Sequence, residues 1–527
     1  MSGDTIAIYI GVGIYFAIMM AVGYIVKSKI KVTEDYLVGG RKFTLLFNAP
    51  ALAACFLGGS LILALPGVTY GMGVWSDANM WGINPQLGSV FCLLAAGFFY
   101  MPKLWRLKLL SLGDFFYLRF GRGTGFTVSV VTVFTFIFWI AVQILVFAKI
   151  CTVFMGWPLV TSALIGISVI TVYTTMGGLW AVMVTDMIQV TLVTVGVVVL
   201  FFVTVNLVGG WETFMESIPA DKNHWVPSVQ ETPGATLHVW LAFIAGYALM
   251  AVGSIVSPDL MQRAFAAKTA SVARNSAIIA ALIKAALCVI MVGVAFVGYI
   301  LVQDGIFSEE LMGGDVELLV PVMVKEFLPL PVVILFVGAC LSSVMGAASS
   351  ALLALSGMMS KNIIKDFIKP DISDKQLVFA CRACVIAFAV LGIVCALSLK
   401  YVYLLVALGF DLIMASLFAC MTLGMFWKKT NQYGAVAGII AGLAFRVLGP
   451  ALTEGISLTS IAYAGDTWYL WTLLSPILAF AVTIVVSLAT QKQNPSNEYG
   501  FHFDANGDVV MPDGSKVVNG KVENRAA

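Results

Sequence analysis

Charge is the scarcest property of this sequence: only 11% of its 527 residues are Asp, Glu, Lys or Arg, and it has three histidines. Little charge together with 60% hydrophobic residues excludes a water-soluble globular chain and predicts an integral membrane protein. The net charge of +2 gives no basis for binding nucleic acid. A phosphate-cradling GxxxxGK[ST] loop is also missing, so transport driven by ATP is not expected.

Metal-ligand clusters and catalytic groupings are missing as well. All nine cysteines lie in apolar segments, and the one C-x-x-C, Cys381 and Cys384, has no second pair or histidines nearby. We interpret them as small core residues. A nucleophile, a base and an orienting group do not recur together, so we do not expect an enzyme.

Apolar runs long enough to cross a bilayer recur along the chain. At about twenty residues per crossing, they predict about thirteen membrane-spanning helices. The first run is followed, not preceded, by the basic stretch KSKIK, which indicates a retained helix and not a cleavable signal peptide. The expected spans are residues 5–26, 44–70, 78–102, 125–155, 158–176, 180–208, 236–259, 273–302, 330–360, 376–399, 401–427, 434–450 and 468–490.

Basic residues gather at one side of these spans. Lys and Arg cluster after the odd-numbered spans, whereas the intervening loops carry almost none. The positive-inside rule therefore predicts an N-terminus outside and a C-terminus in the cytoplasm, in a multi-pass protein of the plasma (inner) membrane. Such clusters include Lys27, Lys29 and Lys31, then Arg263, Lys268 and Arg274, and then Lys428 and Lys429.

Three charges inside the spans are the first candidates for function, because an ionisable group in hydrocarbon is costly and usually lines a binding site. They are Asp186, Lys149 and Asp411. Asp411 lies about ten residues, roughly 15 Å, from the nearer end of its span, too deep to snorkel. Lys149 is close to a span end, so snorkelling is as good an interpretation as a functional role.

Helix-breaking residues interrupt two spans at depth. The second span contains Gly58, Gly59 and Pro66, and the seventh contains Gly253 and Pro258. Broken helices in corresponding segments predict the central binding site of a transporter, because the freed carbonyl groups need a polar cavity. An ordinary kink is the alternative. Two longer external segments, 209–237 and 303–328, form either lids or simple connectors.

Four motifs then resemble the sodium:solute symporter family: TEDYLVGGRKF, YTTMGGLWAVMVTDMIQ, QRAFAAK and FWKKTNQYGAVAGIIAG, in this order. The resemblance implies an all-α, leucine-transporter-like fold with a core of five helices and five inverted counterparts, driven by a sodium gradient. It divides the chain into a first helix with a cytoplasmic loop (1–43), a ten-helix core (44–427), two accessory helices (428–490) and a polar cytoplasmic tail (491–527).

The usual sodium site of the family is incomplete in this sequence. The resemblance places backbone carbonyl ligands at Ala54, Leu57 and Ser343, but the expected pair of hydroxyl ligands falls on Gly346 and Ala347. Neither residue has a hydroxyl group. We therefore expect this site to be weak.

A rarer sodium position of the family does match: the hydroxyls of Ser349 and Ser350 with the carboxylate of Asp186. Ser342 and Ser343 lie four residues before the Gly346 and Ala347 pair, on the same helical face. Serines thus flank the expected ion position on both sides, although close packing of small residues is an alternative reason for them.

The expected solute site is less sharply defined. Phe56 and Trp139 match positions at which the choline-type branch of the family has aromatic rings that hold a quaternary ammonium by cation-π contact. Ser257 stands where a further ring is expected. Lys149 and Asp411 lie on spans that border the central cavity of this fold, where they either pair with each other or receive a carboxylate and an amine.

We therefore predict a secondary active transporter that imports a small organic solute with sodium by alternating access. Proton coupling through Asp186 or Asp411 and a solute sensor that does not transport are the alternatives. Expected partners are the solute, the sodium ion and the bilayer, with no obligate protein partner.

Overall fold

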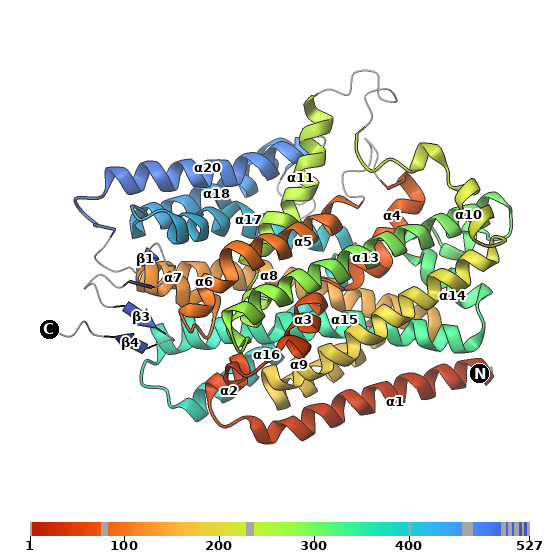
Figure 1. The fold of residues 1–527 in the computed structure, drawn as a ribbon, viewed down its shortest axis with the longest axis horizontal. Helices are drawn as coiled ribbons and strands as arrows, with labels where there is room; N and C mark the ends of the chain where they lie inside the picture. Colours follow the sequence, from red (N-terminus) through yellow and green to blue (C-terminus); the bar gives the residue numbers. More distant parts are fainter. Residues whose placement is uncertain are drawn as a thin grey trace.

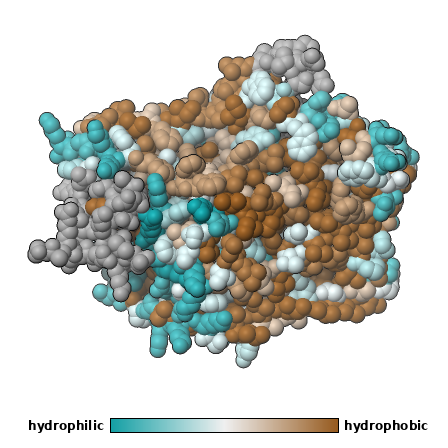
Figure 2. Space-filling model, in the orientation of Figure 1, coloured by the Kyte–Doolittle hydropathy of each residue, from teal (hydrophilic) through white to brown (hydrophobic). Residues whose placement is uncertain are grey.

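The computed structural model describes residues 3–74, 83–227, 237–399, 402–455 and 467–496, and four short strands beyond them. Most of its helices run side by side along the longest axis of the molecule (Figure 1). Eleven helices of the described residues are long and apolar enough to cross a membrane. Figure 2 shows hydrophobic residues across the middle of the visible face and hydrophilic residues gathered toward its ends. This is the surface pattern of a multi-pass membrane protein.

The second crossing is broken in its middle. Its first helix ends at Ala54, regular helix resumes at Gly59, and residues 55–58 between them have no regular helix. Gly58 is needed there because an added Cβ would lie 2.6 Å from Gln143 Oε1. Pro66 does not cause the break, since it occupies the first turn of the next helix, where proline is tolerated. The segments are α3 (Leu45–Ala54), a π-helical turn (Ser60–Ala64) and α4 (Leu65–Met72).

The seventh crossing is broken in the same way. A 3-10 turn (Ser254–Val256) follows α11 (Leu237–Gly253), Ser257 is extended, and α12 (Pro258–Ala266) then begins on its proline. The two broken crossings are the first helices of two five-helix repeats. The predicted leucine-transporter-like core is confirmed.

A third glycine reverses the chain between two crossings. α9 (Leu159–Leu207) has 49 residues, and at about 1.5 Å per residue it is more than twice as long as a ~30 Å hydrocarbon core. Gly178, with φ 49° and ψ −143°, divides it into two helices. With this division and the broken second crossing, the eleven long helices account for the expected thirteen crossings.

The other elements surround the two repeats. Figure 1 shows α1 along one edge of the molecule and α18 with α20 along the opposite edge, so α9 and α15 lie between them. The further helices are α1 (Gly3–Val26), α2 (Thr33–Val38), α5 (Asn84–Ala95), α6 (Met101–Arg106), α7 (Leu112–Phe120), α8 (Arg122–Met155), α10 (Trp211–Ser217), α13 (Ala270–Gln303), α14 (Leu319–Phe327), α15 (Leu330–Met358), α16 (Asp374–Ser398), α17 (Val402–Phe426), α18 (Gln432–Glu454) and α20 (Trp468–Ala489).

The predicted polar tail contains a small sheet. Its strands pair antiparallel in the order β1-β2-β3-β4. They lie near the end of the molecule opposite to the start of α1 (Figure 1). Of the two longer external segments, 209–237 includes α10 and 303–328 includes α14, while residues 228–236 lie outside the described residues. The strands are β1 (His502–Phe503), β2 (Val509–Val510), β3 (Lys516–Val518) and β4 (Lys521–Glu523).

We predict that Gly178→Ala destabilises the protein. A Cβ at this position would lie 2.6 Å from Tyr36 Cδ2 and 2.7 Å from the Tyr36 carbonyl oxygen, and the backbone strain adds roughly 1–3 kcal/mol. The melting temperature of the purified protein in detergent should fall by several degrees. Gly13→Ala is the control, because nothing lies within 4 Å of its added Cβ. Equal melting temperatures for the two variants would contradict the role of Gly178.

Candidate ion- and solute-binding site

The break in the second crossing lies against α15 at the residues that the sequence predicts. The Ser343 hydroxyl donates to the Leu57 carbonyl oxygen at the break. A Cβ added to Gly346 would lie 3.4 Å from the Cβ of Ala54. Fold and sequence therefore agree in bringing Ala54, Leu57, Ser343 and Gly346 together.

The expected sodium ligands do not complete a site here. Gly346 and Ala347 are buried and carry no side-chain oxygen, and the Leu57 carbonyl oxygen already accepts the Ser343 hydroxyl. A hard cation prefers several oxygen ligands, and carbonyls alone supply too few. The residues present at this position do not fit the usual ion.

Oxygen atoms from α9 face Gly346 instead. The virtual Cβ of Gly346 would lie 2.9 Å from Gln189 Oε1 and 3.2 Å from Asp186 Oδ1. Both residues are almost completely buried. Because Gly346 has no side chain, the carboxylate oxygen of Asp186 and the amide oxygen of Gln189 approach it. The sequence resemblance led us to expect a hydroxyl side chain at this position.

Arg263 occupies the other side of the Asp186 carboxylate. Its Nη2 lies 3.3 Å from Asp186 Oδ2 and also donates to the Ser350 hydroxyl. The residue is 0% exposed and lies in α12, so its assignment to a basic loop after the seventh crossing is wrong. The loop assignment failed because a second buried helix, α12, follows the break in the seventh crossing and contains Arg263. A charged residue at the end of an apolar run looks the same in sequence whether it is buried or in a loop.

The serines of α15 differ in their bonding. Ser349 Oγ donates to the Gly346 carbonyl oxygen at 3.1 Å, and Ser350 accepts from Arg263. Ser342 Oγ is buried and faces the Tyr15 hydroxyl, without a hydrogen bond of good geometry among the described residues. Ser349 and Ser350 therefore remain predicted ion ligands. The Ser349 hydroxyl keeps its lone pairs after donating, whereas the Ser350 oxygen accepts from the Arg263 guanidinium.

A second buried cation, Lys284 of α13, was missed from the sequence. Its Nζ donates to the Phe56 carbonyl oxygen at 2.7 Å and to Gln86 Oε1 at 2.6 Å. Among the described residues, no carboxylate forms an ion pair with it. The signal was visible, because Lys284 is the one charge in the run IIAALIKAALCVIMV.

Of the two predicted aromatic residues, Phe56 lies at the break next to Lys284, and Trp139 lies on α8, which packs against the same break through Gln143. Phe56 belongs to the break that holds the Lys284 ammonium. Trp139 of α8 is 1% exposed and packs edge to face on Phe410, with ring centroids 5.0 Å apart. Ser257, where a further ring was expected, donates its hydroxyl to the Ser254 carbonyl oxygen at 2.8 Å.

Lys149 and Asp411 are not paired with each other. Lys149 Nζ lies 2.7 Å from Asp315 Oδ2 and also pairs with Glu317, both in the segment before α14. Burial raises the pKa of Glu317, and the Lys149 ammonium acts in the opposite direction. Lys149 and Asp315 line a pocket of about 400 Å³ at this end of α8.

Asp411 faces the accessory helices. Its Oδ2 accepts from Arg446 Nε of α18 and from Thr472 Oγ1 of α20, each at 2.7 Å. These contacts bind α17 to the two helices outside the ten-helix core. The predicted role of Asp411 in solute binding gains no support from them.

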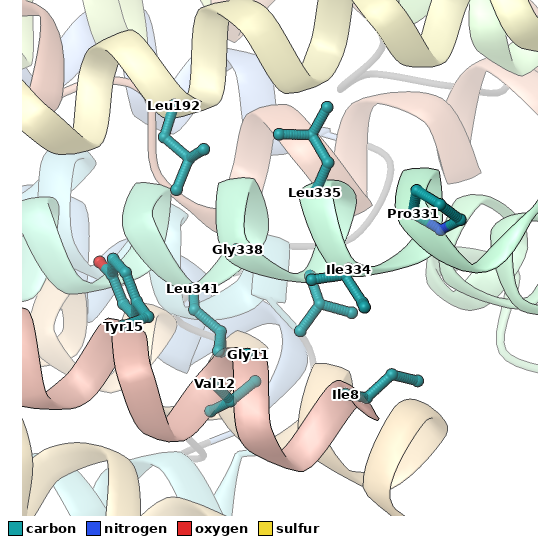
Figure 3. A pocket seen from close by; sticks show the side chains of 11 residues that line it. Ile8, Gly11, Val12, Tyr15, Leu192, Pro331, Ile334, Leu335, Gly338 and Leu341 are labelled. Atoms are coloured by element: carbon teal, nitrogen blue, oxygen red, sulfur yellow. The ribbon is translucent and has the colours of Figure 1, made fainter. Parts of the chain in front are cut away.

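An apolar pocket lies beside the centre, between α1, α9 and α15. Its volume is about 300 Å³. Figure 3 shows Tyr15 at one end of this pocket and Pro331 at the other. The lining is apolar apart from the Tyr15 hydroxyl, so it offers no charged group to a polar solute.

Comparison with known proteins gives a consistent result. The family model described as "Sodium:solute symporter family" matches residues 36–442. The chain is 25% identical to a human high affinity choline transporter 1, over 79% of this chain and 71% of that one. It is 24% identical to a Vibrio parahaemolyticus sodium/glucose cotransporter, over 82% and 83%. It is 22% identical to an osmoregulated proline transporter of Bacillus subtilis, over 91% and 95%.

Solved structures share the fold. A Na⁺-coupled sialic acid symporter in a substrate-bound outward-open state has a TM-score of 0.77 at 19% identity, with 93% of this chain and 98% of that chain covered. A nucleobase-cation-symport-1 family transporter has a TM-score of 0.55 at 14% identity, with 88% and 95% covered.

We predict energetic coupling between Lys149 and Glu317. Lys149→Met leaves the buried Glu317 carboxylate without its partner, and Glu317→Gln leaves Lys149 with Asp315 alone. The double variant should therefore lose less stability than the sum of the single losses, by roughly 1–3 kcal/mol. Melting temperatures of the four proteins in one detergent measure this coupling. Lys375→Met combined with Glu317→Gln is the control, because Lys375 is exposed at the start of α16. Strict additivity for Lys149 and Glu317 would rule out the ion pair.

Proposed function

The chain belongs to the sodium:solute symporter family, and we propose that it imports a small organic solute across the plasma (inner) membrane. It is a secondary active transporter that couples solute movement to sodium by alternating access. The observation that carries the proposal is the pair of broken crossings. At the first break, the freed carbonyl groups of Phe56 and Leu57 accept from buried side chains at the centre of the fold. At the second, the Ser254 carbonyl accepts both the backbone N–H and the hydroxyl of Ser257.

We propose that the segment before α14 closes one end of the solute path. An added Cβ on Gly67 of α4 would lie 2.5 Å from the Val316 carbonyl oxygen, so this segment packs directly on the second half of the broken crossing. Lys149 ties the same segment to α8. Alternating access then requires the Lys149 pairs to break and re-form, as interface ion pairs do in other rigid-body transitions.

Asp186 is the proposed counter-charge for sodium. Of the predicted ion ligands Asp186, Ser349 and Ser350, it has a side-chain oxygen, Oδ1, without a partner among the described residues. A cation stripped of water needs opposite charge as well as oxygen atoms, and a carboxylate supplies both. A proton on Asp186 is the competing proposal, and the two differ in whether a sodium gradient drives uptake.

The solute site is proposed between Lys284, Phe56 and Trp139. A lysine ammonium has three donors, and two of the Lys284 donors are engaged by protein oxygens. The remaining donor and the uncompensated charge favour a solute with a carboxylate. They disfavour a purely cationic solute, which the ammonium would repel. The aromatic rings then contact the apolar part of the solute.

We predict that Asp186→Asn loses sodium dependence. The change keeps the shape of the side chain and removes its charge, so half-maximal uptake should need at least tenfold more sodium, or uptake should fail. The measurement is solute uptake into proteoliposomes under an inward sodium gradient, with potassium in its place as the reference. Asp371→Asn, on an exposed turn, is the matched control. Equal sodium dependence in Asp186→Asn and the parent would reject the role of Asp186.

We also predict that the solute carries a carboxylate. Choline and glycine betaine, ethanolamine and glycine, and prolinol and proline are matched pairs that differ in hydroxymethyl versus carboxylate. In a thermal-shift screen with sodium, at least one carboxylate member should raise the melting temperature and its partner should not. Lys284→Met should weaken that ligand roughly tenfold or more, because a charge-assisted hydrogen bond of about 1.5–3 kcal/mol is lost. Lys375→Met should not.

Stabilisation by hydroxymethyl members alone would contradict the carboxylate assignment. So would a Lys284→Met protein that binds the carboxylate member as tightly as the parent does.

A further inference from the structure

Three buried side-chain oxygens lack hydrogen-bond partners beside the break in the second crossing. Within the described residues they are Asp186 Oδ1, Gln189 Oε1 and Ser342 Oγ, the last of which faces the Tyr15 hydroxyl without a hydrogen bond of good geometry. The three residues are 0%, 1% and 0% exposed. Burying a polar oxygen without a partner is costly, and for a carboxylate oxygen the cost is largest. A cluster of such atoms needs a ligand that supplies positive charge.

Two of these oxygens converge on one point. That point is the place of a Cβ on Gly346, 2.9 Å from Gln189 Oε1 and 3.2 Å from Asp186 Oδ1. Ser342 lies one helical turn before Gly346 on the same face of α15. Ala54, the last helical residue before the break, has its Cβ 3.4 Å from the same point.

The orientation of the Gln189 amide is set by its other end. Its Nε2 donates to the Tyr15 hydroxyl at 3.1 Å and to Met19 Sδ at 3.5 Å. Both partners are on α1, so the amide oxygen is turned away from α1 and toward Gly346. The Tyr15 side chain thus holds Gln189 as an acceptor, the role that a cation ligand needs.

The charges around this point do not balance. Arg263 is the cation next to Asp186, and Asp259 is a second buried carboxylate that acts on both. Asp186, Asp259 and Arg263 are 0%, 2% and 0% exposed. With both carboxylates ionised, the cluster has one negative charge in excess. One further positive charge, carried by a monovalent cation or by a proton, would neutralise it.

Only one side of the Asp186 carboxylate is available to that cation. The guanidinium of Arg263 lies against Asp186 Oδ2 and the Ser350 hydroxyl. A second cation there would be repelled at short range. Oδ1 faces the opposite way, toward Gly346 and Gln189.

We propose that the coupled sodium ion binds beside Gly346, between Asp186 Oδ1 and Gln189 Oε1, with Ser342 Oγ as a further ligand. The inference rests on the proposed sodium coupling and changes the ligands assigned to it. Gln189 and Ser342 take the part of the hydroxyl ligands that were expected at positions 346 and 347. The Arg263 guanidinium takes the place of the ion that was expected beside Ser350.

The test is binding of radioactive sodium to the purified full-length protein in lipid nanodiscs. Gln189→Leu should weaken sodium binding at least tenfold, and Gly346→Ala should do the same because its methyl group would crowd both ligand oxygens, at 2.9 Å from Gln189 Oε1 and 3.2 Å from Asp186 Oδ1. Ser342→Ala should weaken binding severalfold. Gln189→Glu keeps an oxygen at this position and should bind sodium at least as tightly as the parent, which separates ligand loss from misfolding.

Matched controls come from the same helix. Ser356→Ala removes a hydroxyl that donates to the Leu353 carbonyl oxygen, and Gly338→Ala adds a methyl group that would lie 3.3 Å from a Leu192 methyl group. Both should bind sodium like the parent.

The outcomes test the sodium coupling and the proposed sodium ligands separately. A parent protein that binds no sodium would overturn the sodium coupling itself. A parent that binds sodium, with unchanged affinity in Gln189→Leu and Gly346→Ala, would overturn this site and leave the coupling standing. Loss of binding in Ser349→Ala, without loss in Gln189→Leu, would place the ion at Ser349 and not at Gln189.

Discussion

The ion pair between Arg263 and Asp186 is the contact on which the centre of the molecule depends. It joins α12, which begins after the break in the seventh crossing, to α9 of the first repeat, and Arg263 also reaches α15 through Ser350. Burying such charges costs several kcal/mol per ion, and removing one partner leaves the other uncompensated. A purely structural role would be served better by apolar packing, so the pair indicates a site that requires charge.

In our proposal, the ion and the solute bind next to the same break in the second crossing. Ala54 lies next to the proposed sodium position, and the carbonyl oxygen of Phe56, two residues later, holds the Lys284 ammonium. A ligand that fixes either side fixes the conformation of the short segment between them. The affinity of each ligand then depends on the other, and this coupling is reciprocal. In this proposal, a few residues of irregular backbone couple sodium to solute.

Hydropathy predicted the crossings well because a bilayer demands long apolar helices, and glycine positions located the two breaks. Side-chain partners were harder to predict. Lys284 was visible as a single charge in an apolar run. Arg263, in contrast, was assigned to a loop because it comes directly after an apolar run. The partners of Gln189 come from α1, 174 residues away at Tyr15, and those of Asp411 come from the accessory helices. Such pairings depend on tertiary packing, which hydropathy does not encode.

The most direct measurement is a pair of high-resolution electron cryomicroscopy maps of the protein in nanodiscs, one in sodium and one with N-methylglucamine as the cation. The account predicts a density peak between Asp186 Oδ1, Gln189 Oε1 and Ser342 Oγ that is present in sodium and absent without it. A sodium-dependent peak beside Ser349 and Ser350, or identical maps at Gly346 under the two conditions, would contradict it.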